Sequence, residues 1–157
     1  MPRMETTYFG EMDYAADSVF QFPAGLPGFE SERAFLFLQQ PDTEPLMFMQ
    51  SLFDPKLCFL LLPVLAADPN YRTHLNSDQL SELHLPPEHQ PRIGEDILCA
   101  AILCAGDETR LQPTVNLMAP IVLNLKERIG MQVIQEGSSY SCQHTLSAND
   151  QELAPCS

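Results

Sequence analysis

The stretch LMFMQSLFDPKLCFLLLPV, residues 46–64, holds two short apolar runs that are separated by Asp54 and Pro55. Short apolar runs that end at Pro, Gly, Asp or Asn are typical of β-strands. The second run is continuous rather than alternating, which indicates a strand that is covered on both faces.

Runs of the same kind recur along the rest of the chain. They are SVFQF, AFLFL, DILCAAILCA, TVNLM, PIVLNL and GMQVIQ. The 14 prolines fall mostly between the runs and not within them, where a proline would remove a ladder hydrogen bond. The pattern predicts a mostly β protein, folded as a small, antiparallel, β-barrel-like single domain with one or two short helices.

One helix is predicted over the sequence SDQLSELHL, residues 77–85. Asn76 or Ser77 can cap its start by accepting a hydrogen bond from a free backbone N–H. Leu80 and Leu83 share one face of such a helix, so we expect that face to lie against the barrel.

Length and composition favour one globular domain. A chain of 157 residues, 45% of them hydrophobic, can bury a real core. We expect the domain to span residues 1–146, followed by a flexible polar tail at 147–157. The longest apolar run, 57–67, falls short of the ~17–25 residues that cross a membrane. The N-terminus has no secretory signal pattern, so we expect a cytoplasmic protein whose cysteines are reduced thiols.

The chain is strongly acidic. It has 8 Lys and Arg residues against 21 Asp and Glu residues, which gives a net charge of −13. This charge repels phosphate backbones, so we expect no direct binding of nucleic acid. It favours a basic protein partner, although surplus carboxylates can also serve solubility alone.

The segment FPAGLPGFE, residues 22–30, has two closely spaced glycines, as phosphate-binding loops do. Its prolines remove backbone N–H donors, and it lacks the strand-to-helix context of such loops. Two successive turns explain it better. Pro23 and Gly25 suit the second and fourth positions of the first turn, and Pro27-Gly28 has the order of a type II turn. We therefore expect these four residues to set the direction of the backbone.

Candidate catalytic and metal-binding residues have little support. Cys99 and Cys104 are five apart, so in a regular strand they point to opposite faces, and buried free thiols explain them better than metal binding. Cys142 and His144 would share one face of an extended chain and could form a thiol–imidazole nucleophile, but no orienting group or oxyanion hole accompanies them. We expect no enzymatic activity, no metal and no cofactor.

Three histidines and two asparagines remain to be explained. His74, His84 and His89 match no metal-ligand spacing, so we expect them on the surface. Asn116 and Asn124 interrupt the apolar run VNLMAPIVLN. Each can satisfy a turn or a strand edge, and each can instead contact a partner protein.

Five motifs follow one another between residues 6 and 146. They are FGEMDY, FQFPAGLPGFE, LMFMQSLFDPKLCFLLLPV, TVNLMAPIVLNLKERIGMQVI and YSCQHTL. The combination of the Phe-Pro-x-Gly-Leu-Pro-Gly-Phe corner with the Asn-Leu-x-Ala-Pro-Ile-Val-x-Asn segment is specific, although no single motif would suffice. In this order and spacing the chain resembles FliW, the flagellar assembly factor family.

The resemblance implies a small β-barrel-like protein without enzymatic activity that acts in bacterial flagellum assembly. It implies two partners, bound in turn: flagellin, and CsrA, the basic carbon storage regulator that represses translation of flagellin mRNA. By analogy, new flagellin holds the factor while it accumulates. Once flagellin is exported, the freed factor binds CsrA and translation resumes. We expect the free protein to be a monomer.

Two alternatives stay open alongside this regulatory role. One is a chaperone of flagellin that has no role in translation. The other is a split-barrel enzyme that holds a flavin or another small ligand, because unrelated functions share such folds.

Five polar residues are candidate partner contacts. Asp54, Asn116 and Asn124 lie at motif positions where a core has no use for a polar side chain, and Tyr140 and His144 belong to the segment YSCQH. The resemblance does not assign any of them to flagellin or to CsrA.

Overall fold

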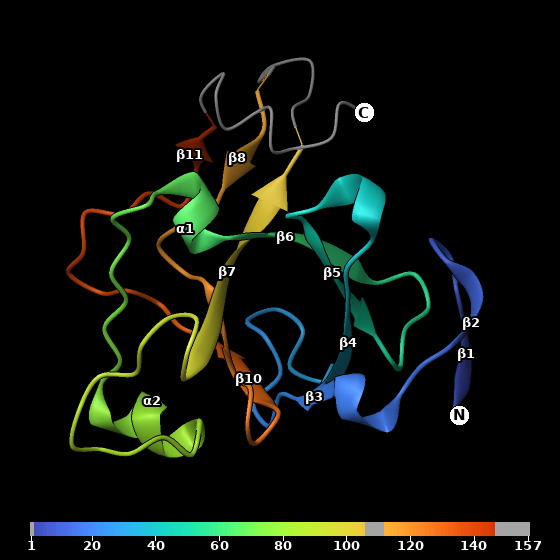
Figure 1. Ribbon diagram of the computed structural model, residues 1–157, viewed down its shortest axis with the longest axis horizontal. Helices are drawn as coiled ribbons and strands as arrows, with labels where there is room; N and C mark the ends of the chain where they lie inside the picture. Colours follow the sequence, from blue (N-terminus) through green and yellow to red (C-terminus); the bar gives the residue numbers. More distant parts are fainter. Residues whose placement is uncertain (1, 106–111, 147–157) are drawn as a thin grey trace.

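The computed structural model describes residues 2–105 and 112–146, and seven of its strands close into a barrel (Figure 1). Around the barrel the order is β7, β6, β5, β4, β3, β10, β9, and β9 pairs again with β7. The bounds are β3 Val19–Gln21, β4 Ala34–Leu38, β5 Met47–Ser51, β6 Cys58–Pro63, β7 Ile97–Cys104, β9 Ile121–Asn124 and β10 Ile129–Gln132. The predicted β-barrel-like fold is confirmed. The predicted tail at 147–157 lies outside the described residues.

All neighbouring strands of the barrel are antiparallel except one pair. Strands β3 to β7 follow one another as a meander, and the β9–β10 hairpin fills the gap between β7 and β3. Strands β3 and β10 run parallel, with Gln21 opposite Ile129. The N–H of Gln21 also donates a hydrogen bond of 2.9 Å to the carbonyl of Arg128. This parallel seam joins the β9–β10 hairpin to the first strand of the meander.

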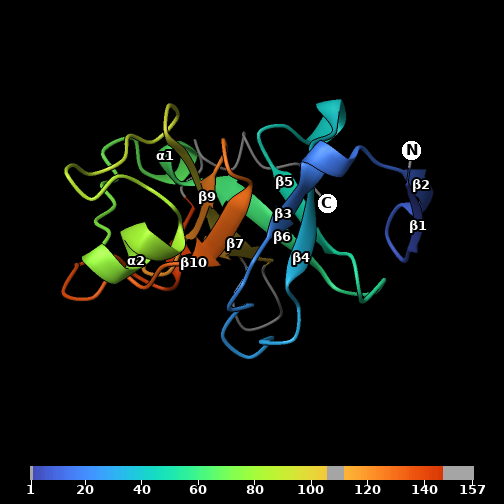
Figure 2. The same ribbon diagram turned by 90° about the horizontal axis from the view of Figure 1, so that it is seen from below.

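Shorter elements lie outside the barrel. Strands β1 (Arg3–Thr6) and β2 (Gly10–Asp13) form a separate hairpin to one side of it, as Figure 2 shows. Strands β8 (Thr114–Val115) and β11 (His144–Thr145) continue the sheet from the end of β7. The helices are α1 Val64–Ala67, α2 Ser77–Glu82 and the single 3-10 turns η1 Ala16–Ser18 and η2 Pro41–Thr43. Within the described ranges, none of these helices is long and apolar enough to cross a membrane.

Side chains fill the inside of the barrel. They are Phe20, Phe22, Leu26, Phe35, Met47, Met49, Leu61, Ala100, Ile121 and Leu123. Barrels of about eight strands have an interior just wide enough for side chains to fill. At Gly130 on β10 the packing is so close that an added Cβ would lie 2.6 Å from the side chains of both Leu123 and Phe22.

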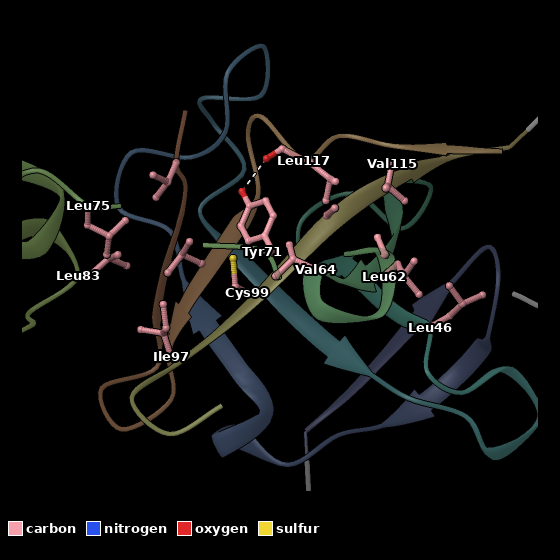
Figure 3. Close-up of a cluster of buried hydrophobic side chains, with 14 of the residues drawn as sticks. Leu46, Leu62, Val64, Tyr71, Leu75, Leu83, Ile97, Cys99, Val115 and Leu117 are labelled. Carbon is pink, nitrogen blue, oxygen red and sulfur yellow. Dashed lines mark hydrogen bonds between the residues drawn. The ribbon is translucent and has the colours of Figure 1, made fainter. Parts of the chain in front are cut away.

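A second apolar cluster covers the outer face of β6, β7 and β9 (Figure 3). It brings together residues of these strands, both α-helices and the connecting segment 68–76. Its members include Leu62, Val64, Tyr71, Leu75, Leu83, Ile97, Val115 and Val122. Strand β9 is consequently buried at all its positions. The continuous apolar runs therefore arise because these strands have a core on each side.

Helix α2 follows its predicted start. Asn76 is the N-cap: its side chain accepts a hydrogen bond from the N–H of Gln79, whose side chain bonds back to the N–H of Asn76. The helix ends at Glu82, earlier than the predicted segment, because His84 adopts a left-handed φ of 57°. The N–H of the following Leu85 then bonds back to the carbonyl of Leu80 at 2.8 Å, which terminates the helix.

Candidate functional site

Three of the five candidate contact residues lie in one region of the molecule. Asn116 directly follows β8, and His144 lies on β11 opposite Val115 of β8. Tyr140 belongs to the segment that leads into β11. The remaining two candidates, Asp54 and Asn124, follow β5 and end β9, so the structure does not gather the five into one site.

Tyr140 packs inside this region. Its ring stacks on Tyr71 with 4.2 Å between ring centroids, and its hydroxyl accepts a hydrogen bond of 2.8 Å from the N–H of Arg72. The hydroxyl of Tyr71 donates to the carbonyl of Leu117 at 2.6 Å (Figure 3). Burial raises the pKa of Tyr71 well above its ordinary value, so this phenol is a neutral donor. The two tyrosines therefore hold the connecting segment 68–76 against the end of the barrel.

Asn116 stabilises a turn. Its Oδ1 accepts hydrogen bonds from the N–H groups of Met118 and Ala119 at 3.1 and 3.0 Å. This is the geometry with which asparagine side chains replace a backbone turn bond. The side chain is half-buried, and the neighbouring Met118 is exposed.

Asn124 is buried, with 3% of its surface exposed. Its Nδ2 donates to the carbonyl of Leu83 at 2.7 Å, which fixes the end of α2 to β9. Its Oδ1 accepts from the N–H groups of Lys126 and Glu127 at 3.1 and 3.2 Å, in the turn after β9. The structure thus gives Asn124 an internal role. A partner protein could contact its side chain only if the end of α2 and the turn after β9 moved away from it.

Two glutamines that the sequence analysis passed over hold the same connecting segment. Gln135 pairs with both backbone groups of His74, accepting at 2.8 Å and donating at 3.1 Å. Gln90 does the same to Leu75, at 2.9 and 3.0 Å. Each side-chain amide thus supplies the hydrogen bonds that a neighbouring strand would otherwise give to the backbone N–H and carbonyl of the segment. Gln135 also lines a groove of about 570 Å³.

The described cysteines divide by burial. Cys99, on β7, is buried, and burial raises its pKa to about 12. Burial likewise raises the pKa of Cys58 to about 11. Cys104 lies at the exposed end of β7, which corrects the expectation that both it and Cys99 are buried, because the strand runs out beyond the covered face. Among the described residues no group of three or more His, Cys, Asp and Glu side chains could hold a metal.

Cys142 and His144 do not share one extended strand. Cys142 is exposed and lies in a turn, whereas His144 begins β11. The premise that a strand places the two side chains on one face therefore fails, since the turn interrupts the alternation.

The turn between β5 and β6 contains Asp54. The Oδ1 of Asp54 accepts a hydrogen bond of 3.0 Å from the N–H of Lys56. The buried Ser51 Oγ accepts from the N–H groups of Phe53 and Asp54 at 3.1 and 3.0 Å. Phe53 itself is 69% exposed. The turn is therefore rigidly built and presents an aromatic ring to solvent.

The glycine-rich corner forms two turns. The N–H of Gly25 bonds to the carbonyl of Phe22 at 2.8 Å, with Pro23 in the second position. In the next turn the N–H of Phe29 bonds to the carbonyl of Leu26 at 2.7 Å, and Gly28, after Pro27, has a φ of 85°. A positive φ at this place marks a type II turn. No free row of N–H groups that could cradle a phosphate results from this geometry.

Comparison with known proteins gives one consistent result. Residues 3–146 match the family model described as FliW protein. The chain is 35% identical over 144 residues to "Flagellar assembly factor FliW" of Desulfitobacterium hafniense strain Y51, and the match covers 92% of this chain and 90% of that protein. It is 32% identical to the protein of the same name from Geobacillus kaustophilus, covering 92% and 94%.

A solved structure has the same fold. The chain superimposes on the crystal structure of a flagellar assembly factor FliW with a TM-score of 0.80 and 31% sequence identity. The superposition covers 94% of this chain and 99% of that one. The two proteins therefore share one overall fold.

Proposed function

The chain belongs to the FliW family of flagellar assembly factors, and from this membership we propose that it regulates flagellin synthesis by binding flagellin and CsrA in turn. The family match over residues 3–146 is the observation that carries the proposal. Flagellin holds the protein while flagellin accumulates in the cytoplasm. Export of flagellin frees the protein, which then binds CsrA and relieves the repression of flagellin mRNA.

The charge of the chain supports an electrostatic part of this mechanism. A net charge of −13 favours encounter with a basic repressor. Once docked beside an RNA site, a protein of this charge would extend a negative potential over that site and oppose the approach of phosphate groups. Such an effect is screened over about 8 Å at physiological ionic strength, so the association must depend strongly on salt.

The packing of the barrel leaves no room for a small ligand inside it. The interior is filled by aromatic and aliphatic side chains, and the barrel cannot accept even one methyl group at Gly130 without movement of its neighbours. A flavin or another small ligand inside the barrel would have to displace this core. We therefore place the function on the outer surface. We further propose that the protein binds other proteins and is a monomer when free.

The test is a calorimetric titration of this protein with purified CsrA at about 50 and 200 mM salt, two conditions between which surface charges are screened very differently. We expect saturable binding that weakens as salt rises. A parallel titration with flagellin should also saturate. Binding of flagellin without binding of CsrA at either salt concentration would leave only the flagellin chaperone, and the regulatory proposal would be wrong.

A further inference from the structure

Two turns that are far apart in the sequence meet beside the barrel. The turn of the β1–β2 hairpin contains Tyr8, and the turn between β5 and β6 contains Phe53. The N–H of Thr7 donates a hydrogen bond of 3.0 Å to the carbonyl of Pro55, and Figure 2 shows the tip of the hairpin beside this turn. Tyr8 is 65% exposed and Phe53 is 69% exposed. Two large aromatic rings are thus displayed on adjoining turns.

The turn that carries Phe53 is held by buried polar side chains. The Nε2 of Gln50, a residue with no exposed surface, lies 3.0 Å from the carbonyl of Ser51 and 3.2 Å from that of Asp54. Ser51, also without exposed surface, bonds the N–H groups of Phe53 and Asp54. Burying an amide and a hydroxyl costs free energy, and these bonds offset it only in part, because the Oε1 of Gln50 is buried without a hydrogen-bond partner. Two buried polar side chains, Gln50 and Ser51, therefore fix the conformation of a turn whose Phe53 side chain faces solvent.

A third turn joins the same region. Glu32, just beyond the glycine-rich corner, accepts a hydrogen bond of 2.6 Å from the hydroxyl of Ser51. The corner exposes Phe29, whose ring packs edge-on against Phe59 of β6 at 5.5 Å. Tyr8, Phe29 and Phe53 consequently lie on three turns that are bonded to one another through backbone and side chains. We call these three residues the aromatic turn surface.

We propose that the aromatic turn surface is the docking surface for a basic protein partner, with Phe53 and Tyr8 as its anchors; the inference rests on the proposed function, in which that partner is CsrA. Exposed aromatic side chains on a rigid support are the residues that dominate binding energy in protein interfaces. Glu32, bonded to Ser51, and Asp54, which follows Phe53, place two carboxylates in this turn network, and the exposed Lys56 lies in the same turn. An arginine or lysine of the partner can pack over a ring while its charge faces these acids.

The charge of the chain disfavours two other occupants. A second copy of this protein would bring together two chains that each carry −13, and an anionic membrane would be repelled in the same way. A basic protein surface is the occupant that both the exposed rings and the net charge favour.

The test compares surface variants in calorimetric titrations against purified CsrA. Phe53→Ser and Tyr8→Ser remove the anchors, and we expect both variants to fold because most of each side chain is exposed. Leu125→Ser and Ile134→Ser are the matched controls, because they remove exposed apolar side chains, 42% and 49% exposed, at other places on the chain. We expect each anchor variant to weaken the affinity by about 30-fold or more, as for interface hot spots, and each control to change it less than about two-fold.

The possible results distinguish an error in the proposed docking surface from an error in the proposed function. Binding by the unmodified protein that is equally strong in the anchor variants would overturn the surface and leave the proposed function intact. Absence of CsrA binding by the unmodified protein would overturn both. If the anchor variants no longer bind flagellin but still bind CsrA, the aromatic turn surface is not the docking surface for the basic partner, and the proposal is wrong about which protein binds there.

Discussion

The side chain of Asn124 on β9 donates a hydrogen bond of 2.7 Å to the carbonyl of Leu83 at the end of α2. The same side chain accepts bonds from two N–H groups of the turn that follows β9. One buried amide therefore joins the barrel, a helix and a turn. Its removal would leave the carbonyl of Leu83 and two N–H groups of the turn without this partner.

Replacement of Asn124 by Ala should lower the free energy of unfolding by about 2–4 kcal/mol, because a buried carbonyl and two N–H groups lose their partner. Replacement of the half-buried Asn116 by Ala is the matched control, since water can reach its turn and the cost should be about 1 kcal/mol. Urea unfolding followed by circular dichroism measures both. Equal losses for the two variants would contradict an internal role that is specific to Asn124.

The glycine-rich corner permits a comparison of two glycines with positive φ. At Gly25 a Cβ would lie 2.6 Å from the backbone oxygen of Glu30, whereas at Gly28 it would meet nothing within 4 Å. Gly28→Ala should therefore cost only the strain of a left-handed backbone, about 1–2 kcal/mol. Gly25→Ala adds a backbone clash and should cost about 2–4 kcal/mol. Midpoints of urea unfolding in the reverse order would show that the corner is not packed as described.

Alkylation should distinguish the thiols of Cys99 and Cys58 from those of Cys104 and Cys142. Burial raises the pKa of Cys99 to about 12 and that of Cys58 to about 11, so both stay protonated and unreactive at pH 8. We expect iodoacetamide to modify Cys104 and Cys142 first in the native protein, as read from peptide masses, and all four at similar rates in urea. Rapid modification of Cys99 in the native state would contradict its burial.

The raised pKa of Cys99 also predicts how the stability of the fold changes with pH. A thiol that remains protonated in the folded protein but ionises in the unfolded chain stabilises the fold fully below the ordinary pKa of 9.0. This stability should be lost as the pH rises from about 9 towards 12. Cys99→Ala should show a shallower loss over that range when unfolding midpoints are measured at successive pH values. An identical slope in both proteins would show that Cys99 ionises equally in the two states.

The electrostatic part of the proposed mechanism predicts the behaviour of a charge variant. Glu5, Asp17, Glu88 and Glu136 are exposed, and replacing them by the matching amides removes four negative charges. The association rate with CsrA should fall several-fold at low salt, because steering scales with charge, while the dissociation rate changes little. Stopped-flow measurements at two salt concentrations test this. An unchanged association rate at low salt would show that electrostatic steering does not contribute to the association.

Sequence patterns predicted the barrel and helix α2 because each rests on local chemistry. Short apolar runs, proline positions and the cap at Asn76 act within a few residues, and the structure follows them. The parallel seam between β3 and β10 could not be predicted, since it depends on how the meander closes and not on either strand. The left-handed turn at His84 was missed for a similar reason, because a histidine gives no conformational signal of the kind that glycine gives.

The candidate contact residues show what a local pattern leaves open. Asn124 interrupts an apolar run, which allowed either a turn or a partner contact; its Oδ1 does stabilise a turn, but the bond of its Nδ2 to a distant helix end had no signal in the sequence. Gln50 and Ser51 interrupt a run in the same way, and this polar pair was the available signal for the rigid turn. The exposure of Phe53 had no signal, since phenylalanine within an apolar run is ordinarily core.

The most direct test of the regulatory account follows labelled flagellin leader RNA bound to CsrA by fluorescence anisotropy. We predict that addition of this protein releases the RNA and lowers the anisotropy, and that addition of flagellin then restores it. RNA that stays bound in the presence of saturating protein, or a release that flagellin does not reverse, would contradict the exchange of partners on which the account depends.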